Sequence, residues 1–489
     1  MNPQYYIACD LGAESGRVML GALQDGKLEI QEIHRFSNGP VRIMGSLRWN
    51  TLRIFEELKR GLRKVAERGI APRSLSVDSW GVDYVLTRGR EPQITLPHHY
   101  RDARTDSTYE PALKKATPEL IFQETGIQFM SINTLYQFLS DTIEQPELLA
   151  LTDRFLLMGD YFNYLFSGAR VAEQSLASTT QLYNPRKRAW SAELIRIFGF
   201  DERIFPEIVP SGTILGPMRD DIVEETKLGG IQVVAACSHD TGAAVAAVPA
   251  EGEDWAFLSS GTWSLIGVEL PEPLINEDVR RANFTNEAGF GGTTRFLKNM
   301  SGLWLLQECR REWAGEYGYE ELTRLALETQ LLRSLINPTS PRLARPGQMP
   351  RKIQEECKAN GEPIPVTPGQ IARCIQESLA LTYRTTFEQL QQLTGRTLNK
   401  LHIVGGGSQS RLLNQAAADA IGCPVIAGPV EATAIGNLLV QCIALKDIES
   451  LAALRKIVRN SVPVTTYNPG DREAWDEAFA RFRIFSNQG

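Results

Sequence analysis

The stretch that decides the fold spans residues 231–265 and reads IQVVAACSHDTGAAVAAVPAEGEDWAFLSSGTWSL. Its first seven residues form an apolar run, which predicts a buried strand. Ser238, His239 and Asp240 follow directly, and the small residues at 241–246 favour a tightly packed helix. An acidic side chain between a strand and a helix is held rigidly, on a surface where backbone N–H groups point outward. Asp240 therefore has two open interpretations: a helix cap, a position that Asp favours, or a catalytic group.

A small polar turn comes after the first strand of the chain. Asp10 ends an apolar run, and residues 11–17 read LGAESGR before the next apolar run. As structure, this is a hairpin whose glycines permit a positive φ. As function, its N–H groups and the Ser15 hydroxyl hold a phosphate, with Asp10 anchoring a hydrated Mg²⁺. Seven residues exceed what a hairpin needs, which favours the phosphate interpretation.

The second half repeats this plan. Residues 259–262, SSGT, separate the apolar runs 255–258 and 263–269. Self-similarity at the start of each half predicts a duplicated domain, although hairpins are frequent enough for a chance resemblance. Two such turns are suited to holding one polyphosphate.

A triple glycine comes after a later buried run. Residues 401–404 predict a strand, 405–410 read GGGSQS, and 411–421 predict a helix. A strand–helix turn needs one glycine, whereas three leave bare backbone that a flat ligand can approach. The spacing is not the G-x-G-x-x-G of a dinucleotide fold, which disfavours NAD.

Three further expectations concern local structure. Apolar residues at helical spacing over 54–65 predict a helix that ends at Gly69. Residues 299–307 are expected to begin a helix after a strand at 295–298. The charged loop at 96–105, with Arg101, Asp102 and Arg104, is interpreted either as a solvated surface or as a recognition site for hydroxyl groups.

Composition excludes several classes of protein. With 489 residues the chain is too long for one core, so two domains are expected, at 1–247 and 248–489. A net charge of −6 without a basic block disfavours nucleic acid and acidic membranes as partners. No signal peptide or membrane span is visible, so we expect a cytoplasmic protein.

The seven cysteines show no C-x-x-C spacing, which argues against structural zinc. An odd number of cysteines without a signal peptide suggests reduced thiols. Cys357 and Cys374 flank a Pro/Gly-rich loop and could approach one another, and whether they form a disulfide is left open.

The motifs together resemble a known family. DLGAESGRVML, SWGVDYVL, YRDART, SHDTGAAV, LSSGTWSL, LKNMSGLWLLQE, LHIVGGGSQSRLLNQ and AGPVEATAIGN succeed one another over almost the whole chain. In this order they are similar to the FGGY carbohydrate kinases of the actin/hexokinase/Hsp70 superfamily. The resemblance implies an α/β fold of two actin-like ATPase lobes with duplicated, ribonuclease H-like domains and an active site in the cleft between them. The N-terminal lobe would bind sugar, and the C-terminal lobe nucleotide.

The same resemblance implies roles for individual residues. Asp240 would be the general base and Asp10 the Mg²⁺ anchor. Residues implied to contact ATP are Ala13, Glu14, Ser15, Gly16, Arg17, Thr262, Gln307 and Gly406. Residues implied to contact the sugar are Gly81, His239, Asp240, Thr241 and Asn299. Glu14 stands where a small hydroxyl residue is expected, so its side chain should point away from the phosphates.

The implied activity is ATP-dependent phosphorylation of L-rhamnulose to its 1-phosphate, in L-rhamnose breakdown. Another ketose or polyol, such as L-fuculose or L-xylulose, remains open as the substrate. A nucleotide-binding sensor or scaffold without turnover is the rival from another class, and the presence of both Asp10 and Asp240 argues against it. We expect a monomer or small homo-oligomer whose lobes close when sugar binds.

Overall fold

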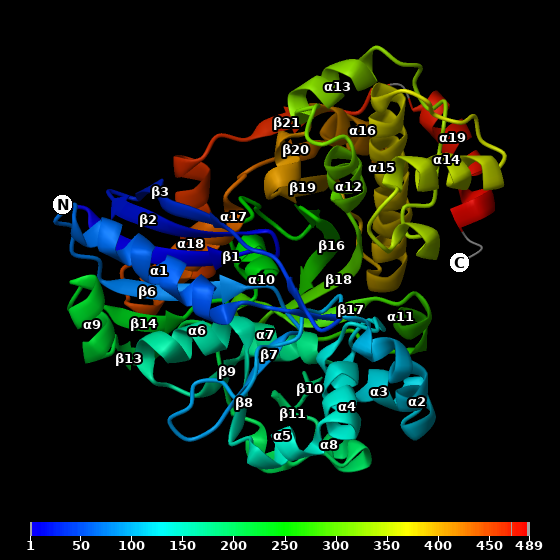
Figure 1. The fold of residues 1–489 in the computed structure, drawn as a ribbon. Coiled ribbons are helices and arrows are strands. Elements are labelled where there is room, and N and C mark those ends of the chain that lie inside the picture. The colour runs from blue at the N-terminus through cyan, green and yellow to red at the C-terminus, as the bar shows by residue number, and fades with distance from the viewer. Residues whose placement is uncertain (1, 471, 487–489) are drawn as a thin grey trace. The chain divides into compact units, whose positions relative to one another are not determined.

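The computed structural model describes residues 2–470 and 472–486, which form two compact units (Figure 1). Each unit is assembled from separate stretches of the chain. The first comprises Met1–Pro249, Glu269–Phe296 and Ala432–Ser461, and the second comprises Ala250–Val268, Leu297–Glu431 and Val462–Gly489.

The first unit is built on a six-stranded sheet with the order β13-β14-β6-β1-β2-β3. The bounds of these strands are Gln4–Leu11 (β1), Ser15–Gln24 (β2), Lys27–Ser37 (β3), Ser74–Ser79 (β6), Thr213–Pro217 (β13) and Gln232–Ala235 (β14). β1, β2 and β3 form an antiparallel meander, as the sequence predicts, whereas β6 runs parallel to both β1 and β14. The carboxyl ends of three parallel strands therefore lie at one edge of the sheet.

Helices cover both faces of this sheet. Gly61 of α1 (Thr51–Ala66) lies against Val18 of β2, and Leu438 of α17 (Ala432–Ala444) lies against Gly21 of the same strand. Alternate side chains of a strand point to opposite faces, so these two helices cover opposite sides. α1 ends at Ala66 rather than at the predicted Gly69. Gly69, with φ of +68°, belongs to the next turn and donates its N–H to the Ala66 carbonyl.

The remaining elements of the first unit extend from the sheet. The helices are α2 (Tyr109–Lys115), α3 (Pro118–Thr125), α4 (Thr134–Glu144), α5 (Pro146–Leu151), α6 (Met158–Ser167), α7 (Gln174–Ala177), α8 (Ala192–Phe198), α9 (Asp220–Thr226), α10 (Asp240–Ala246), α11 (Glu277–Arg281) and α18 (Leu451–Ser461). The short strands are β4 (Val41–Ile43), β5 (Ser46–Arg48), β7 (Tyr84–Thr87), β8 (Arg154–Leu157), β9 (Val171–Glu173), β10 (Tyr183–Asn184), β11 (Ala189–Trp190), β12 (Glu207–Val209) and β17 (Thr285–Ala288).

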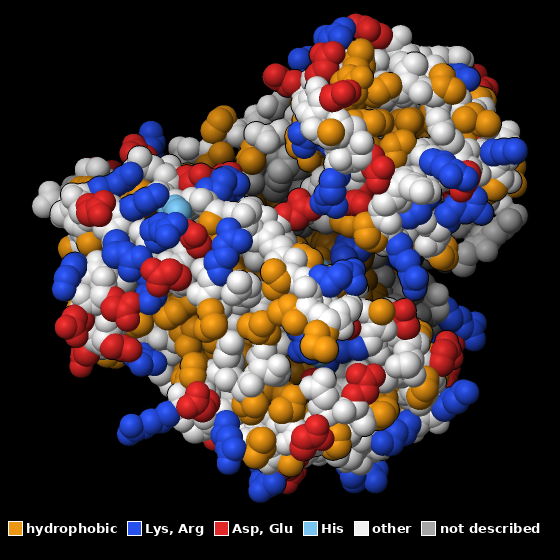
Figure 2. All heavy atoms as spheres, in the orientation of Figure 1, with side chains coloured by type: hydrophobic (Ala, Val, Ile, Leu, Met, Phe, Trp, Pro, Cys, Tyr) orange, Lys and Arg blue, Asp and Glu red, His pale blue; other side chains and the backbone are white. Residues whose placement is uncertain are grey.

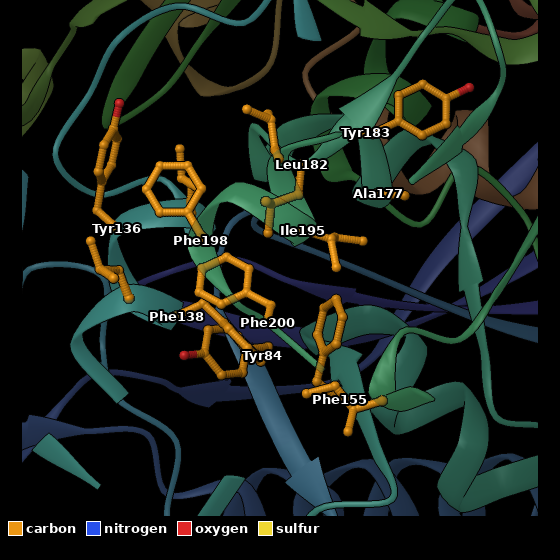
Figure 3. Close-up of a cluster of buried hydrophobic side chains, with 14 of the residues drawn as sticks. Tyr84, Tyr136, Phe138, Phe155, Ala177, Leu182, Tyr183, Ile195, Phe198 and Phe200 are labelled. Atoms are coloured by element: carbon orange, nitrogen blue, oxygen red, sulfur yellow. The ribbon is translucent and has the colours of Figure 1, made fainter. Parts of the chain in front are cut away.

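An aromatic core holds residues 84–208 together (Figure 3). Phe138, Phe155 and Phe200 are fully or almost fully buried, and the rings of Phe138 and Phe200 meet edge to face at 4.9 Å between centroids. Aromatic pairs in this geometry add about 0.5–1.5 kcal/mol beyond the area that they bury. The cluster gives this region a rigid core of its own beside the sheet.

The sheet plan is repeated in a seven-stranded sheet with the order β17-β18-β16-β15-β19-β20-β21, of which β17 and the first residues of β18 belong to the stretch Glu269–Phe296 of the first unit and the central strands belong to the second unit. The bounds are Trp255–Ser260 (β15), Trp263–Leu270 (β16), Thr294–Ser301 (β18), Lys400–Val404 (β19), Val425–Ala427 (β20) and Thr465–Tyr467 (β21). The helices of the second unit are α12 (Trp304–Glu312), α13 (Tyr319–Leu327), α14 (Met349–Ala359), α15 (Pro368–Thr394), α16 (Arg411–Ile421) and α19 (Glu473–Ser486). β15 and β16 are antiparallel, while β15, β19 and β20 are parallel, so the predicted duplication is confirmed at the level of the strand pairing.

Both polar turns are shorter than predicted. Asp10 pairs with Arg17 and Leu11 with Gly16 in the β1–β2 ladder, so the predicted seven-residue loop is wrong. Pairing of β2 with β3 draws residues 15–17 into the sheet as well. In the second unit, Ser259 and Ser260 likewise belong to β15 rather than to the turn. The length of these turns therefore carries no argument for phosphate binding.

Two further expectations are settled by the structure. β18 continues to Ser301 and α12 begins only at Trp304, so Asn299 lies in a strand rather than in a helix. Asp102 and Arg104 are largely buried, and the solvated-surface interpretation is wrong for both. Arg104 pairs with Asp141 and donates to Gln137, while Asp102 accepts from the Leu47 N–H.

The structure describes the surface charge, the helix lengths and the cysteines. Side chains of both charge signs are interspersed over the face in Figure 2. Within the described residues, none of the helices is both long and apolar enough to cross a membrane. The seven cysteines are free thiols, and the Cys357 and Cys374 sulfurs are 3.9 Å apart.

Candidate active site

In the first unit, Ser238 and His239 lie just beyond β14 and are fixed by their backbone N–H groups. The Ser238 N–H donates to Glu173 Oε2 at 3.1 Å, and the His239 N–H donates to Ser175 Oγ at 3.0 Å. Glu173 is fully buried and also accepts hydrogen bonds from the hydroxyls of Ser175 and Ser211. Burial raises its pKa, and these donors oppose the rise. This carboxylate holds the segment before Asp240 in place, and the sequence pattern gave no sign of it.

Asp240 is the first residue of α10 and is not its N-cap. His239 occupies the cap position and makes no side-chain capping bond. Asp240 Oδ1 accepts from the N–H and, at 3.1 Å, from the hydroxyl of Thr241, and it lies 3.4 Å from His239 Nε2. Among the described residues, no hydrogen bond or ion pair reaches Asp240 Oδ2, and 31% of the Asp240 side chain is exposed. One carboxylate oxygen is thus anchored, and the other is available to a ligand.

Burial raises the pKa of Asp240 above its ordinary value, and nearby Asp10 adds to the rise while His239 opposes it. A carboxylate with a raised pKa is a stronger base than a free aspartate. The arrangement therefore suits proton acceptance from a hydroxyl group at Oδ2.

Two aspartates, Asp10 and Asp78, lie where β1 and β6 run side by side. Asp10 and Asp78 are partners in the parallel register, and Arg17 forms an ion pair with Asp10. Asn437 Nδ2 donates to Asp78 Oδ2 at 2.5 Å. Asp78 Oδ1 is buried and has no hydrogen-bond partner in the part of the chain that the structure describes. Burial, followed by the charge of Asp10, raises the pKa of Asp78 well above its usual range.

These two carboxylates fit a magnesium ion in part. Mg²⁺ is usually bound through one or two carboxylates, with water and phosphate oxygens completing its octahedron. The orphaned Asp78 oxygen beside Asp10 provides such a pair. Within residues 2–470 and 472–486, the structure forms no closed cage of three or more His, Cys, Asp or Glu side chains.

The turn after β6 is strained. Val82 has φ of +66°, which is unusual for a β-branched residue. Its N–H donates to Thr179 Oγ1 at 3.1 Å, and a Cβ at Gly81 would lie only 2.8 Å from the same oxygen. Strained backbone of this kind is concentrated at ligand sites. The predicted sugar contact Gly81 therefore lies in a turn where only glycine fits without movement.

Asp83 fixes the end of this turn. It is fully buried, and its Oδ2 accepts from the indole N–H groups of Trp49 at 2.6 Å and Trp80 at 3.0 Å. The same oxygen accepts from the Tyr100 N–H, while Gln137 donates to Oδ1. The Trp80–Asp83 turn is thereby joined to an aromatic wall.

In the second unit, the β15–β16 turn contacts the start of α12. The Gly302 and Trp304 N–H groups donate to the Thr262 carbonyl at 3.1 and 3.2 Å. A Cβ at Gly302 would lie 2.6 Å from the Trp263 carbonyl carbon, so only glycine permits this approach. Gln307 lies one turn into α12, and within the described residues its buried Oε1 has no hydrogen-bond partner.

The glycine loop after β19 contacts Ser260, the last residue of β15. A Cβ at Gly407 would lie 1.9 Å from Ser260 Oγ, and Gly405 has φ of +83°. The space around a Cβ at Gly406 is open. The predicted nucleotide contacts Thr262 and Gly406 therefore belong to neighbouring loops, with Ser260 between them.

Comparisons with known proteins give the family. The model of the N-terminal domain of the FGGY family of carbohydrate kinases matches residues 5–247, and that of the C-terminal domain matches residues 256–445. The chain belongs to the FGGY family of carbohydrate kinases. It is therefore a sugar kinase.

Relatives and solved structures agree with this membership. A rhamnulokinase of Bacteroides thetaiotaomicron is 42% identical over 98% of this chain and 99% of its own, and one of Enterococcus faecalis is 41% identical over 95% of each. The fold resembles that of a xylulose kinase from Lactobacillus acidophilus, with a TM-score of 0.83 at 14% identity over 99% of this chain and 98% of that chain. The predicted actin-like kinase fold is confirmed.

Proposed function

We propose that this FGGY-family kinase transfers the γ-phosphoryl group of ATP to the 1-hydroxyl of L-rhamnulose. The observation that carries the choice of sugar is the similarity, at 38–42% identity over nearly the whole chain, to proteins named rhamnulokinase. The position of Asp240, with one carboxylate oxygen anchored and the other available, supports the chemistry.

Phosphoryl transfer depends mainly on positioning and on neutralising charge. Asp240 Oδ2 accepts the proton of the attacking sugar hydroxyl, which requires about 2.6–3.2 Å between the two oxygens in the reacting complex. Gly81, His239, Thr241 and Asn299 bind the remaining sugar groups. The raised pKa of Asp240 favours this proton transfer.

The nucleotide is bound by backbone and hydroxyl groups. Residues 13–17 and Thr262 contact the phosphates, and Gln307 and Gly406 contact the nucleoside. Mg²⁺, when bound, neutralises part of the phosphate charge. Asp10 would hold it with Asp78 beside it, and the ion pair with Arg17 orients the Asp10 carboxylate.

The test is ADP release by the purified protein with ATP and Mg²⁺, across L-rhamnulose, L-fuculose, L-xylulose and glycerol. We expect kcat/KM to be highest for L-rhamnulose, with the product phosphorylated at carbon 1 by ³¹P–¹³C coupling in NMR spectra. A preference for another sugar would replace the substrate and keep the reaction type. An absence of sugar-stimulated release with every sugar would contradict the proposal.

A further inference from the structure

A buried ion pair lies behind His239. Arg295 of β18 is fully buried, and its Nη1 lies 3.1 Å from Glu287 Oε2 of β17. Arg295 Nε donates to the Ala288 carbonyl at 3.1 Å, which fixes the guanidinium plane. Gly242 lies over this plane, since a Cβ there would be 3.6 Å from Arg295 Cζ. All of these residues belong to the first unit.

The guanidinium also reaches the imidazole. Arg295 Nη2 lies 3.1 Å from His239 Nδ1, and Glu287 Oε2 lies 3.3 Å from the same nitrogen. An arginine side chain is always a donor and never an acceptor. A lone pair on His239 Nδ1 accepts from the guanidinium, whereas a proton there would face an N–H group and would have Glu287 Oε2 as its acceptor. With the lone pair on Nδ1, the ring proton is on Nε2.

The Nε2 side of the ring faces the proposed base. His239 Nε2 lies 3.4 Å from Asp240 Oδ1, the oxygen that Thr241 also holds. An N–H in this position favours the carboxylate and keeps Oδ2 turned toward the hydroxyl group of the sugar. A lone pair in the same position would repel the carboxylate.

We propose that Arg295 and Glu287 are positioning residues for phosphoryl transfer, which hold His239 in the Nε2–H tautomer so that it donates toward Asp240 Oδ1. The inference rests on the proposed function, in which Asp240 is the general base. Glu287 balances the buried charge of Arg295. Neither residue touches the reacting atoms.

The first test reads the tautomer directly. The chain contains five histidines, so ¹⁵N-histidine labelling gives a small set of imidazole signals, and His239→Asn assigns the one of interest. In the wild-type protein without ligands we expect a protonated Nε2 and an unprotonated Nδ1 for His239. In Arg295→Met, Glu287 is the remaining partner of Nδ1, and the proton should move to Nδ1.

The second test reads turnover. Loss of the Nε2–H group that faces the Asp240 carboxylate predicts that Arg295→Met lowers kcat with L-rhamnulose by about tenfold or more, with KM for ATP unchanged. The double variant Glu287→Gln/Arg295→Met replaces the carboxylate with an amide whose N–H can donate to Nδ1. It should restore the Nε2–H tautomer and part of kcat. It also removes both buried charges, so it remains informative if the single variant does not fold.

A matched control is Arg373→Met. Arg373 is likewise largely buried and pairs with Glu377 at 2.6 Å, and it donates to the Ala326 and Thr329 carbonyls, all in the second unit. It should lower the melting temperature without changing the tautomer of His239. A merely structural role for Arg295 predicts the same result for Arg295→Met, and that result would overturn the proposal.

Failure of the proposed function gives a different result. The tautomer is measured without sugar or ATP, so it does not depend on activity. No sugar-stimulated ADP release by the wild-type protein would contradict the proposed function alone. An Nδ1–H tautomer in the wild-type protein, or a double variant that does not recover relative to Arg295→Met, would contradict the positioning role alone.

Discussion

The two units share one strand plan and differ in the residues at the carboxyl end of each strand. After β6 comes the turn with Trp80, Gly81 and Asp83, whereas the corresponding β19 is succeeded by three glycines. After β14 come His239 and Asp240, whereas after β20 comes Gly-Pro-Val-Glu. The first unit thus presents indole, imidazole and carboxylate groups, and the second presents mainly bare backbone and hydroxyls.

This difference matches two kinds of ligand. A sugar is distinguished by the directions of its hydroxyl groups, which charged and aromatic side chains can read. Phosphates and a flat base need N–H groups and close approach of the backbone, which glycine provides. In the proposed function, the base Asp240 belongs to the first unit, whereas the nucleotide contacts Thr262, Gln307 and Gly406 belong to the second.

The largest effect on turnover should come from Asp10 and Asp78 of the first unit, through the Mg²⁺ that they are proposed to hold. Removal of Mg²⁺ with EDTA should lower turnover by about 10³-fold or more, because several kcal/mol of charge stabilisation are lost. Asp10→Asn should raise the Mg²⁺ concentration needed for half-maximal rate. ADP release across a magnesium titration measures both, with Ca²⁺-saturated EDTA as the control for the chelator. Full turnover without divalent cations would exclude a role for the metal.

The next prediction concerns the three consecutive glycines after β19 in the second unit. Gly407→Ala places a methyl group against Ser260 Oγ and should lower the free energy of unfolding by about 1–3 kcal/mol. Gly406→Ala adds a methyl group in open space and should leave the free energy of unfolding nearly unchanged. It should raise KM for ATP, since the added carbon lies where the nucleotide is proposed to approach. Denaturant unfolding and ATP titration separate the two effects, and an unaltered KM in Gly406→Ala would exclude Gly406 from nucleotide binding.

These glycines illustrate how far the sequence could predict the site. The apolar runs around 231–237 and 401–404 predict strands because the pattern is local. The triple glycine predicts a ligand loop, but the structure gives Gly405 and Gly407 conformational and packing reasons and leaves open space only at Gly406. The helix of Arg411–Ile421 is also predicted from a local pattern, because its apolar spacing and the Gly422 that ends it lie within one short segment.

Other parts of the site had no local signal. Glu173, Glu287 and Arg295 are charged residues whose burial arises only when distant segments pack together. The predicted length of the polar turns was wrong because strand pairing across β1, β2 and β3 is a tertiary property.

The pH dependence of kcat/KM should reflect the environment of Asp240. A base acts when deprotonated, so the rate falls as pH drops through its pKa. Burial raises that pKa above 3.8, which places the acid limb at higher pH than for an ordinary aspartate. At pH values below the pKa of Asp240, kcat/KM should fall about tenfold per pH unit. A profile that stays flat down to pH 4, measured where the protein remains folded, would contradict the base assignment.

The smallest effect should come from Thr241. Its hydroxyl donates to Asp240 Oδ1 at 3.1 Å, while its backbone N–H donates to the same oxygen independently of the side chain. Thr241→Val removes only the hydroxyl, and the loss of about 0.5–1.5 kcal/mol predicts a decrease in kcat of a few fold. Thr241→Ser should retain the wild-type rate. Equal rates for the Val and Ser variants would show that the backbone bond alone anchors Oδ1.

The measurement that tests the central claim most directly is the turnover of Asp240→Asn with L-rhamnulose, ATP and Mg²⁺. The amide has nearly the same shape and cannot accept the proton, so we predict a normal melting temperature, retained sugar binding by calorimetry, and a kcat lower by about 10²–10⁴-fold. Near-normal turnover in a folded Asp240→Asn protein would contradict the assignment of Asp240 as the general base.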